Sequence, residues 1–362
     1  MARLIDITGK AVSGEWGTDD LDGSGIPVLR TTNFTNTGDV SYANVVTRSI
    51  SKKNIANKFL RKGDIIIEKS GGSDKQPVGR VIYFEGEENK YLFNNFTGLL
   101  RVVNSQKWHS KYVFYSLYAN YQKGGTRAFE NKTTGLHNLK LDNYLNAVEI
   151  RNISYEIQEQ RSVELDKLRK VINLRLAQLA KLDELVKCRF VEMFGDPVTN
   201  PKQFPCFLLG EIVKFQGGSQ PDKKHFEYES SPHNIRLLQI RDYKSDRFVT
   251  YIPKALAKRF CSADDIMIGR YGPPIFQILG GIEGAYNVAL MKAIPQRGNK
   301  EFIRQFLKQD CLLKYLEGLS KRTAGQDGIQ MDKLKSYPFP YPPDKLQDAF
   351  AAFVQRIDKL RF

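Results

Sequence analysis

The amino-acid sequence predicts a mixed α/β (α+β) chain in which two similar domains are separated by long helices that pair as an antiparallel coiled coil. The first observation behind this prediction is the stretch from Ser154 to Phe194, which contains neither Gly nor Pro. The second is a faint repeat of ordered motifs on either side of that stretch. The third is an amphipathic segment at the end of the sequence, which offers the stretch a partner.

The central stretch is expected to form one helix, with Ser154 as its N-cap, Gly195 as its stop and Pro197 just beyond. Its apolar residues recur at steps of three or four and form one stripe. The stripe comprises Leu165, Leu168, Ile172, Leu176, Leu179, Leu182, Val186, Phe190 and Met193. A helix of roughly 60 Å needs a packing partner along its length. An ordinary core helix is the alternative interpretation.

The last segment, residues 341–362, opens with a Pro-Pro pair and carries an apolar stripe of its own. Phe353, Ile357 and Leu360 are the residues of that stripe expected to contact the central helix. At roughly 30 Å, this helix matches only about half of the central one. Either it is naturally short, or another subunit or a second copy of the chain covers the remaining surface.

The composition of the 362 residues is globular, with 41% hydrophobic and 11% aromatic residues, and the net charge is +15. The positive excess lies mainly in residues 1–150 and 196–340, which favours two folded surfaces that face a polyanion such as DNA. The four cysteines are far apart, so neither a zinc site nor a disulfide framework is expected. Without a signal peptide or a long apolar run, a cytoplasmic location is expected.

Two series of motifs occur in the same order before and after the central helix. In residues 1–150, short apolar runs predict strands at 26–30, 63–68, 78–84 and 99–103, and a Tyr-rich helix at 110–122. The paired motifs are Leu29–Asn33 with Leu238–Asp242, Asp64–Ile67 with Asp265–Ile268, Gly135–Leu141 with Gly328–Leu334, and Ile157–Glu159 with Leu346–Asp348. We infer an internal duplication from this repeated order. It predicts domains at 1–150 and 196–340 and helices at 151–195 and 341–362.

This ordered set resembles the specificity (S) subunit of type I restriction–modification systems over essentially the whole chain. The resemblance rests also on Gln158-Glu159-Gln160, Leu165-Asp166-Lys167-Leu168 and Phe194-Gly195-Asp196-Pro197. It implies two target-recognition domains that each read one half of a bipartite DNA sequence, and a helical spacer between them.

The resemblance also implies partners and a biological role. Two modification (methyltransferase) subunits would bind S-adenosylmethionine and methylate adenine, and restriction (translocase/endonuclease) subunits would use ATP and Mg. The complex would serve DNA methylation and defence against phage. The chain itself would bind double-stranded DNA and hold no cofactor or metal.

The absence of catalytic motifs agrees with a role without chemistry. Neither Pro-Pro pair follows the Asn or Asp of an adenine methylase tetrapeptide, and no phosphate-binding G-x-x-x-x-G-K-[ST] loop occurs. Two alternatives stay open: a DNA methyltransferase or endonuclease with its own recognition domains, and a protein-only coiled-coil adaptor.

Candidate DNA-binding residues combine groups that pair with base edges and groups that contact phosphates. In the first domain they are Arg30, Thr31, Asn33, Lys69, Ser70, Gly71, Gly72, Ser73, Lys75, Gln76, Lys132 and Thr133. In the second they are Arg241, Asp242, Arg270, Tyr271, Arg322, Thr323 and Gln326. Arg270 suits guanine, Asn33 suits adenine, and Asp242 suits the amino group of cytosine. A solvated loop is the alternative interpretation for each of them.

Overall fold

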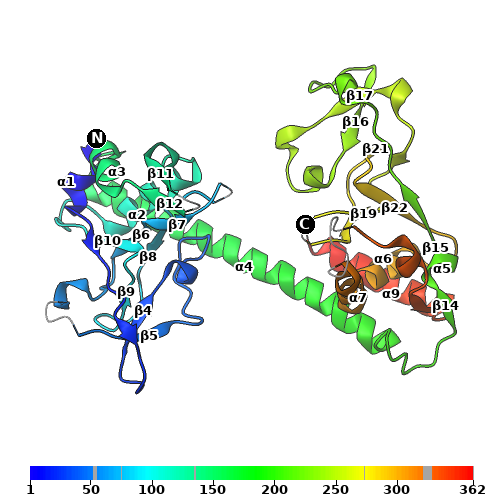
Figure 1. The fold of residues 1–362 in the computed structure, drawn as a ribbon, viewed down its shortest axis with the longest axis horizontal. Helices are drawn as coiled ribbons and strands as arrows, with labels where there is room; N and C mark the ends of the chain where they lie inside the picture. The colour runs from blue at the N-terminus through cyan, green and yellow to red at the C-terminus, as the bar shows by residue number, and fades with distance from the viewer. Residues whose placement is uncertain (52–54, 75, 134–135, 273, 321–327, 362) are drawn as a thin grey trace. The chain divides into compact units, whose positions relative to one another are not determined.

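The structure, a computed structural model, describes residues 1–51, 55–74, 76–133, 136–272, 274–320 and 328–361. The chain divides into two compact units, Met1–Asn173 and Leu174–Phe362 (Figure 1). The long helix α4 (Tyr155–Phe194) contributes residues to both units. Each unit combines β-sheets with helices, which confirms the predicted mixed α/β class.

The first unit is built on three small sheets. The central one has the order β2 (Val12–Ser13), β10 (Thr97–Leu100), β6 (Ile65–Glu68) and β8 (Val81–Tyr83), all antiparallel. The second has the order β3 (Thr18–Asp19), β5 (Val46–Ser49), β4 (Ile26–Leu29) and β9 (Leu92–Phe93), with β4 and β9 parallel. The third joins β11 (Glu130–Thr133), β12 (Leu136–Leu139) and β7 (Ser70–Gly72). A short pair, β1 (Ala2–Arg3) and β13 (Glu149–Ile150), ties the ends together.

Three helices precede α4 in this unit: α1 (Leu4–Thr8), α2 (Ser110–Gln122) and α3 (Leu141–Ala147). The Tyr-rich helix predicted at 110–122 is α2, and it packs against β8. The Ile-Ile-Ile run forms strand β6, and all three residues are apolar because each face of this strand packs against a hydrophobic core. Ile65 and Ile67 face the core that contains α2, and Ile66 faces the core around Leu29. Short 3₁₀ turns lie at η1 (Thr31–Asn33), η2 (Ala56–Lys58) and η3 (Arg127–Phe129).

Two predicted strands differ from the observed ones. The strand predicted at 99–103 is wrong beyond Leu100, since β10 ends there. Arg101 leaves the ladder and pairs its guanidinium with the buried Asp64 (Nη2 to Oδ2, 2.6 Å). The strand predicted at 78–84 is only the three residues of β8, because Gly79 has a φ of 103° and turns the chain just before it.

The second unit repeats this plan after α4. Its central sheet has the order β15 (Val213–Gly217), β22 (Leu290–Pro295), β19 (Ile266–Gly269) and β20 (Gln277–Leu279). A second sheet has the order β17 (Tyr251–Pro253), β16 (Asn234–Leu238), β21 (Gly284–Tyr286) and β18 (Phe260–Cys261). Strand β14 (Cys206–Leu208) pairs with β23 (Pro338–Pro340). The helices are α5 (Leu209–Ile212), α6 (Lys300–Leu307), α7 (Asp310–Ser320), α8 (Met331–Lys335) and α9 (Asp344–Lys359), and 3₁₀ turns lie at η4 (Lys223–His225), η5 (Ile240–Tyr243), η6 (Asp246–Phe248) and η7 (Lys254–Leu256).

The duplication is visible in the two larger sheets of each unit. Each central sheet has four antiparallel strands, and each second sheet contains one parallel pair, β4–β9 in the first unit and β16–β21 in the second. Strand β19 alternates as β6 does, with Ile266 and Ile268 in one core and Met267 in the other. Two related sequences therefore fold into two copies of one arrangement.

One predicted equivalence is wrong by three residues. Lys140 and Gln330 hold the same place, because each is the N-cap residue whose carbonyl accepts a helical amide, from Tyr144 and Leu334 respectively (both 3.0 Å). The counterpart of Gly328 is thus Asn138, whereas Gly135 lies outside the described residues. The shared Gly-apolar letters predict an alignment that differs by three residues from the one given by the hydrogen bonds at the start of α3 and α8.

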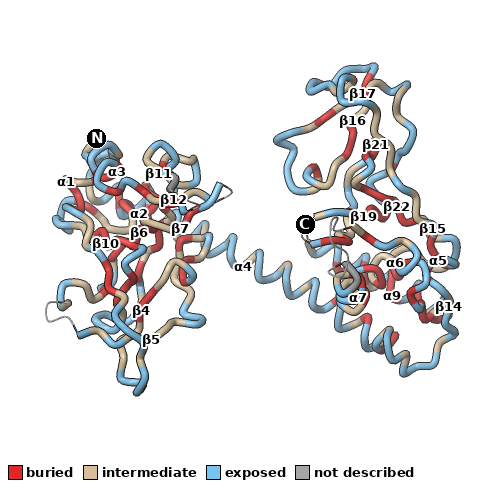
Figure 2. Tube along the Cα trace, in the orientation of Figure 1, coloured by how far each residue is buried: buried red, intermediate tan, exposed pale blue. Residues whose placement is uncertain are grey.

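The apolar stripe of α4 is buried only toward its C-terminal end. Val186 and Phe190 are 4% and 1% exposed, and Leu179 and Leu182 are half-buried. Leu165, Leu168, Ile172 and Leu176 are exposed, between 38% and 59%. Most of the middle of α4 is accordingly coloured as exposed in Figure 2. Helix α4 ends at Gly195 with a φ of 77°, as the sequence predicted.

Helix α9 runs antiparallel to the part of α4 that belongs to the second unit. Phe350, in the first half of α9, packs its ring on Phe194 (centroids 5.3 Å apart), near the end of α4. Arg361, just past the end of α9, pairs with Asp183 (2.6 Å), which lies earlier in α4. Ile357 is buried and Phe353 is half-buried in this seam. Leu360 was expected there and is 55% exposed, because it lies beyond the last residue of α9.

Candidate nucleic-acid interface

Three segments of the first unit meet at one end of its sheets and form what we call the first tip: the turn η1 with Leu29 and Arg30, the turn 94–96, and the segment 69–72. The amide of Asn94 donates to the carbonyl of Leu29 (2.9 Å). The amides of Lys69 and Ser70 both donate to the carbonyl of Phe96 (2.8 and 3.2 Å). Segments far apart in the sequence are thus held together by backbone hydrogen bonds.

The β11–β12 hairpin extends the first tip through the third sheet. In β12, His137 lies opposite Gly72 and Asn138 opposite Ser70. Lys132 and Thr133 lie in β11, opposite residues 137 and 136 of β12. The structure therefore brings two predicted groups, 70–72 and 132–133, into one sheet.

The second unit forms an equivalent second tip. The amide of Asn287 donates to the carbonyl of Leu238 (3.0 Å), and that of Arg270 donates to the carbonyl of Ala289 (2.9 Å). Tyr271 bridges to Gly328, just as Ser70 pairs with Asn138 in the first unit. The two tips share one backbone scaffold and carry different side chains.

Side chains of the first tip are partly held by the protein itself. Arg30 is half-buried, and its Nη2 donates to the carbonyl of Asn44 (3.0 Å), while its buried Nε has no partner. Lys69 donates from Nζ to Oγ of Ser13 (3.2 Å). Burial lowers the pKa of Lys69, and the positive charge of Lys58 lowers it further. Thr31 is half-buried, and its carbonyl accepts a hydrogen bond from Arg80 (3.2 Å).

The turn residues Asn33 and Asp242 were wrongly assigned to base contacts. Asn33 is 1% exposed; its Oδ1 accepts the amide of Arg30 (2.9 Å), and its Nδ2 donates to two carbonyls in residues 41–43. Asp242 is 3% exposed, and its Oδ2 accepts the amide of Gln239 (2.6 Å). The two residues close equivalent turns, and both are buried, so neither side chain is open to a base.

The segment 69–76 is less open than the predicted loop. Ser70–Gly72 form strand β7, and the hydroxyl of Ser70 contacts the side chain of Asn138. Gly71 is exposed with a φ of 120°, a conformation that L side chains rarely adopt. The amide of Ser73 donates to the carbonyl of Gln76 (2.7 Å), which closes a tight turn. Lys75 lies outside the described residues.

In the second tip, Arg270 and Tyr271 stand side by side. Nη1 of Arg270 donates to the carbonyl of Val288 (3.3 Å), and the guanidinium carbon lies 5.5 Å from the ring centroid of Tyr271. Tyr271 is 40% exposed. Arg241 is exposed and lies 5.9 Å from the ring of Phe248. Arg322, Thr323 and Gln326 lie outside the described residues.

Sequence reasoning missed apolar residues at both tips. Phe96 in the first tip and Val288 in the second are about half exposed, although both are hydrophobic. Phe248 is also exposed, with the guanidinium groups of Arg241 and Arg247 over its ring. An aromatic ring with guanidinium groups suits stacking on bases and contact with phosphates. Their only signal in the sequence is an apolar residue in an otherwise polar turn.

An ion pair lies beneath the first tip, and its acidic member has no equivalent at the end of β19. Glu68, at the end of β6, is 1% exposed and binds the guanidinium of Arg80 through both oxygens (2.9 and 3.0 Å). The position equivalent to Glu68 at the end of β19 is Gly269. The first tip therefore has a buried carboxylate at a position where the second has a glycine.

Within the described residues, no group of three or more His, Cys, Asp or Glu side chains is arranged to hold a metal ion. None of the described helices has the length and apolar content to cross a membrane.

The fold defines a class of protein with two equivalent β-rich regions and long helices, α4 and α9. Neither the protein-family models nor the curated proteins contain a match to the sequence. Among solved structures, the chain is similar to the type I restriction–modification system S subunit from M. genitalium. The two share 16% sequence identity, with a TM-score of 0.58 over 99% of this chain and 89% of that one.

Two further structures are similar at lower TM-scores. One is described as the structural basis of complex assembly and conformational transition of the type I R-M system (15% identity, TM-score 0.45, 99% of this chain and 90% of that one). The other is the HsdS subunit from Thermoanaerobacter tengcongensis (15% identity, TM-score 0.38, 99% and 89%). The resemblance stated from the sequence is confirmed at the level of the fold: the chain has the fold of a type I restriction–modification S subunit.

Proposed function

We propose that this chain is the non-catalytic, sequence-specific DNA-binding subunit of a type I restriction–modification complex, and that its two halves read the two parts of a bipartite target. One observation carries the proposal. The two tips share a backbone scaffold, yet Lys69 and Ser70 of the first stand where Arg270 and Tyr271 stand in the second. One scaffold with two sets of side chains suits an asymmetric sequence.

The chemistry of the tips supports a nucleic-acid ligand. Arg270 and Arg30 offer forked donors that match guanine O6 and N7, or a phosphate. The ring of Tyr271 lies beside Arg270, and Phe96 offers an exposed ring in the first tip. With a net charge of +15, the chain is attracted to DNA before any specific contact forms.

The helices are the proposed spacer and docking surface. Leu165, Leu168, Ile172 and Leu176 are apolar and exposed on α4, and we propose that modification subunits cover them. Those subunits would hold S-adenosylmethionine and carry out the methylation, and restriction subunits would hold ATP and Mg. The domain boundaries at 150, 195 and 340 belong to the same proposal.

The decisive experiment compares the methylomes of cells that carry the modification subunit genes with and without this chain. We expect a methylated bipartite sequence that appears only when the chain is present. If the methylated sites are the same without it, another protein supplies the specificity and the proposal fails.

An enzymatic role for the chain alone is tested with labelled S-adenosylmethionine and DNA. The purified chain is expected to transfer no methyl group until a modification subunit is added. The adaptor alternative is tested by the salt dependence of DNA binding, which is steep when several phosphates are neutralised. Absence of binding, or binding that does not change with salt, would favour the adaptor.

A further inference from the structure

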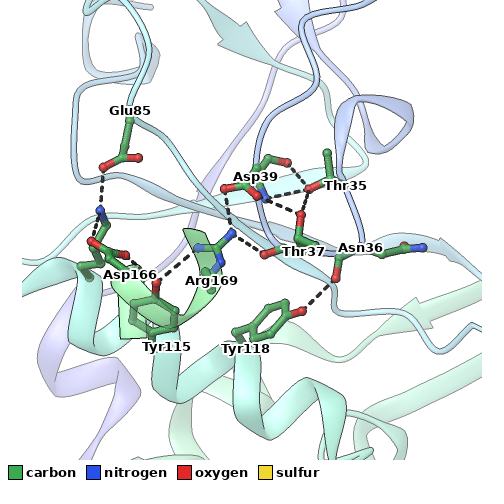
Figure 3. A network of polar contacts seen from close by, with 10 residues as sticks. Thr35, Asn36, Thr37, Asp39, Glu85, Tyr115, Tyr118, Asp166 and Arg169 are labelled. Atoms are coloured by element: carbon green, nitrogen blue, oxygen red, sulfur yellow. Dashed lines mark hydrogen bonds and ion pairs between the residues drawn. The ribbon is translucent and has the colours of Figure 1, made fainter. Parts of the chain in front are cut away.

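Two polar residues one turn apart on α4, Asp166 and Arg169, hold the first unit to this helix (Figure 3). Asp166 accepts from Lys111 Nζ (2.8 Å) and from the hydroxyl of Tyr115, both on α2. Burial raises the pKa of Tyr115 to about 12, so its hydroxyl keeps the proton that it donates. Lys111 also pairs with Glu85, beyond β8 (2.7 Å). This part of the network links α4 to α2 and to the end of the central sheet.

Arg169 binds a different part of the unit, the segment from Thr35 to Asp39, which we call the brace loop. Its Nη2 pairs with Oδ1 of Asp39 (2.7 Å) and donates to the carbonyl of Thr37 (2.5 Å). Its guanidinium lies 5.5 Å from the ring centroid of Phe114 and 5.6 Å from that of Tyr115. The side chain is 21% exposed, so the ion pair is shielded from solvent on one side.

The brace loop has a fixed shape. The hydroxyl of Thr35 accepts the amide of Asp39 (2.8 Å), and the hydroxyl of Tyr118 donates to the carbonyl of Asn36 (2.9 Å). The carbonyl of Gly38 accepts the amide of Tyr83 in β8 (3.0 Å). A Cβ on Gly38 would lie 2.7 Å from the ring of Phe114, and the φ of this glycine is 81°. The loop therefore rests on the sheet, on α2 and on α4 at once.

Hydrogen bonds continue from the brace loop to the first tip. Ser41 lies two residues after the brace loop. Its amide donates to the carbonyl of Asn33 (2.8 Å), and its carbonyl accepts a hydrogen bond from Nδ2 of Asn33 (3.0 Å). Asn33 in turn holds the amide of Arg30, and Arg30 reaches the carbonyl of Asn44. The contact of Arg169 is thus connected to a candidate DNA-reading residue through a short, ordered segment.

In the part of the second unit that the structure describes, no such brace is found. The segment equivalent to the brace loop lies in residues 239–250, and no hydrogen bond or ion pair found among the described residues joins it to α6 or α9. At the positions equivalent to Phe114 and Tyr118 on α2, Arg304 and Lys308 line a cavity of about 730 Å³. Among the described residues, the brace therefore belongs to the first half alone.

We propose that Arg169 is a positioning residue that fixes the first tip relative to the spacer helix, and so sets the number of base pairs that separate the two half-sites. This inference rests on the proposed function, because spacing has meaning only if both halves read DNA. Arg169 itself touches no base; it acts through the brace loop. When the contact is removed, the tip gains freedom relative to α4, and neighbouring spacings become acceptable.

The test uses methylomes of cells that carry the modification subunits with the full chain or with one of three variants. Arg169→Ala removes the guanidinium, Asp39→Asn removes its ionic partner with little change of shape, and Arg161→Ala is the control on the exposed face of the same helix. We expect Arg169→Ala and Asp39→Asn to raise methylation about tenfold at sites whose spacer is one base pair longer or shorter. A tenfold change corresponds to the free energy of one charge-assisted hydrogen bond. The half-site sequences and the control are expected to stay unchanged.

Each result decides the matter. Retention of a single spacer length by both Arg169→Ala and Asp39→Asn would overturn the inference, with the proposed function intact. Loss of all methylation in both variants would also overturn it, because the contact would then serve the fold and not the spacing. If the unaltered chain does not change the methylome, it is the proposed function that fails.

Discussion

Gln158 and Gln347 make the same two hydrogen bonds in the two halves of the chain. Both are fully buried. Oε1 of Gln158 accepts the amide of His109, and Oε1 of Gln347 accepts the amide of Asn299 (both 2.9 Å). Each Nε2 donates to the carbonyl five residues earlier, at Ile153 (2.9 Å) and Pro342 (2.7 Å). A long helix is thus joined to the start of a second helix, α2 or α6, by one side chain.

Replacement of Gln158 by Leu is expected to destabilise the first unit by about 3 kcal/mol, because the amide of His109 and the carbonyls of Lys107 and Ile153 lose their partner. Gln347→Leu should act in the same way in the second unit. Urea denaturation measures both free energies of unfolding. Gln160→Ala is the matched control, since Gln160 is exposed on the same helix. Equal stabilities for Gln158→Leu and this control would show that the buried amide is not needed.

Arg270→Ala is expected to weaken DNA binding about tenfold and to reduce the dependence of log K on log salt by about one unit if the guanidinium contacts a phosphate. If Arg270 reads a base, the loss should be confined to the specific sequence. Fluorescence anisotropy over a salt series distinguishes the two. Lys345→Ala, an exposed charge on α9, controls for the general loss of positive charge. Unchanged binding by Arg270→Ala would remove this residue from the interface.

The buried charge of Lys69 is expected to lower the stability of the folded chain, while the same charge strengthens DNA binding. Its lowered pKa means that the folded state binds fewer protons than the unfolded state between the two pKa values, so stability rises with pH in the alkaline window below the pKa of an ordinary lysine. Below this window the full penalty of burying the charge is present. Lys69→Met should therefore be more stable at pH 7, lose that alkaline rise, and bind DNA more weakly. Urea denaturation at pH 7 and pH 10, with a binding titration, tests this; a less stable Lys69→Met would contradict it.

The two parts of the α4 stripe should respond differently to a charge. Leu168→Asp is expected to change the stability of the isolated chain by only about 0.5 kcal/mol, because Leu168 is 59% exposed. Val186→Asp, which places a carboxylate in the seam with α9, should cost about 3 kcal/mol or more. Thermal unfolding measures both. Co-purification with modification subunits is expected to fail for Leu168→Asp; if it assembles normally, the exposed stripe is not the docking surface.

The sequence by itself determined the periodic and ordered features. The apolar period and the absence of Gly and Pro predicted α4, with its end at Gly195, and the ordered motifs predicted the duplication. The paired motifs Ile157–Glu159 and Leu346–Asp348 place Gln158 and Gln347 at equivalent positions. Local patterns reach this far because helical periodicity and caps depend on residues close in sequence.

Tertiary structure decided which of the polar candidates face outward. Asn33 and Asp242 look like ideal base readers in the sequence, and the fold buries both as turn closures. Phe96 is hydrophobic, and the fold leaves it 51% exposed. The reason is physical: a side chain's direction and partners are set by backbone segments that arrive from elsewhere in the chain. The brace at Arg169 shows this most clearly, because its contacts join residues 130 positions apart.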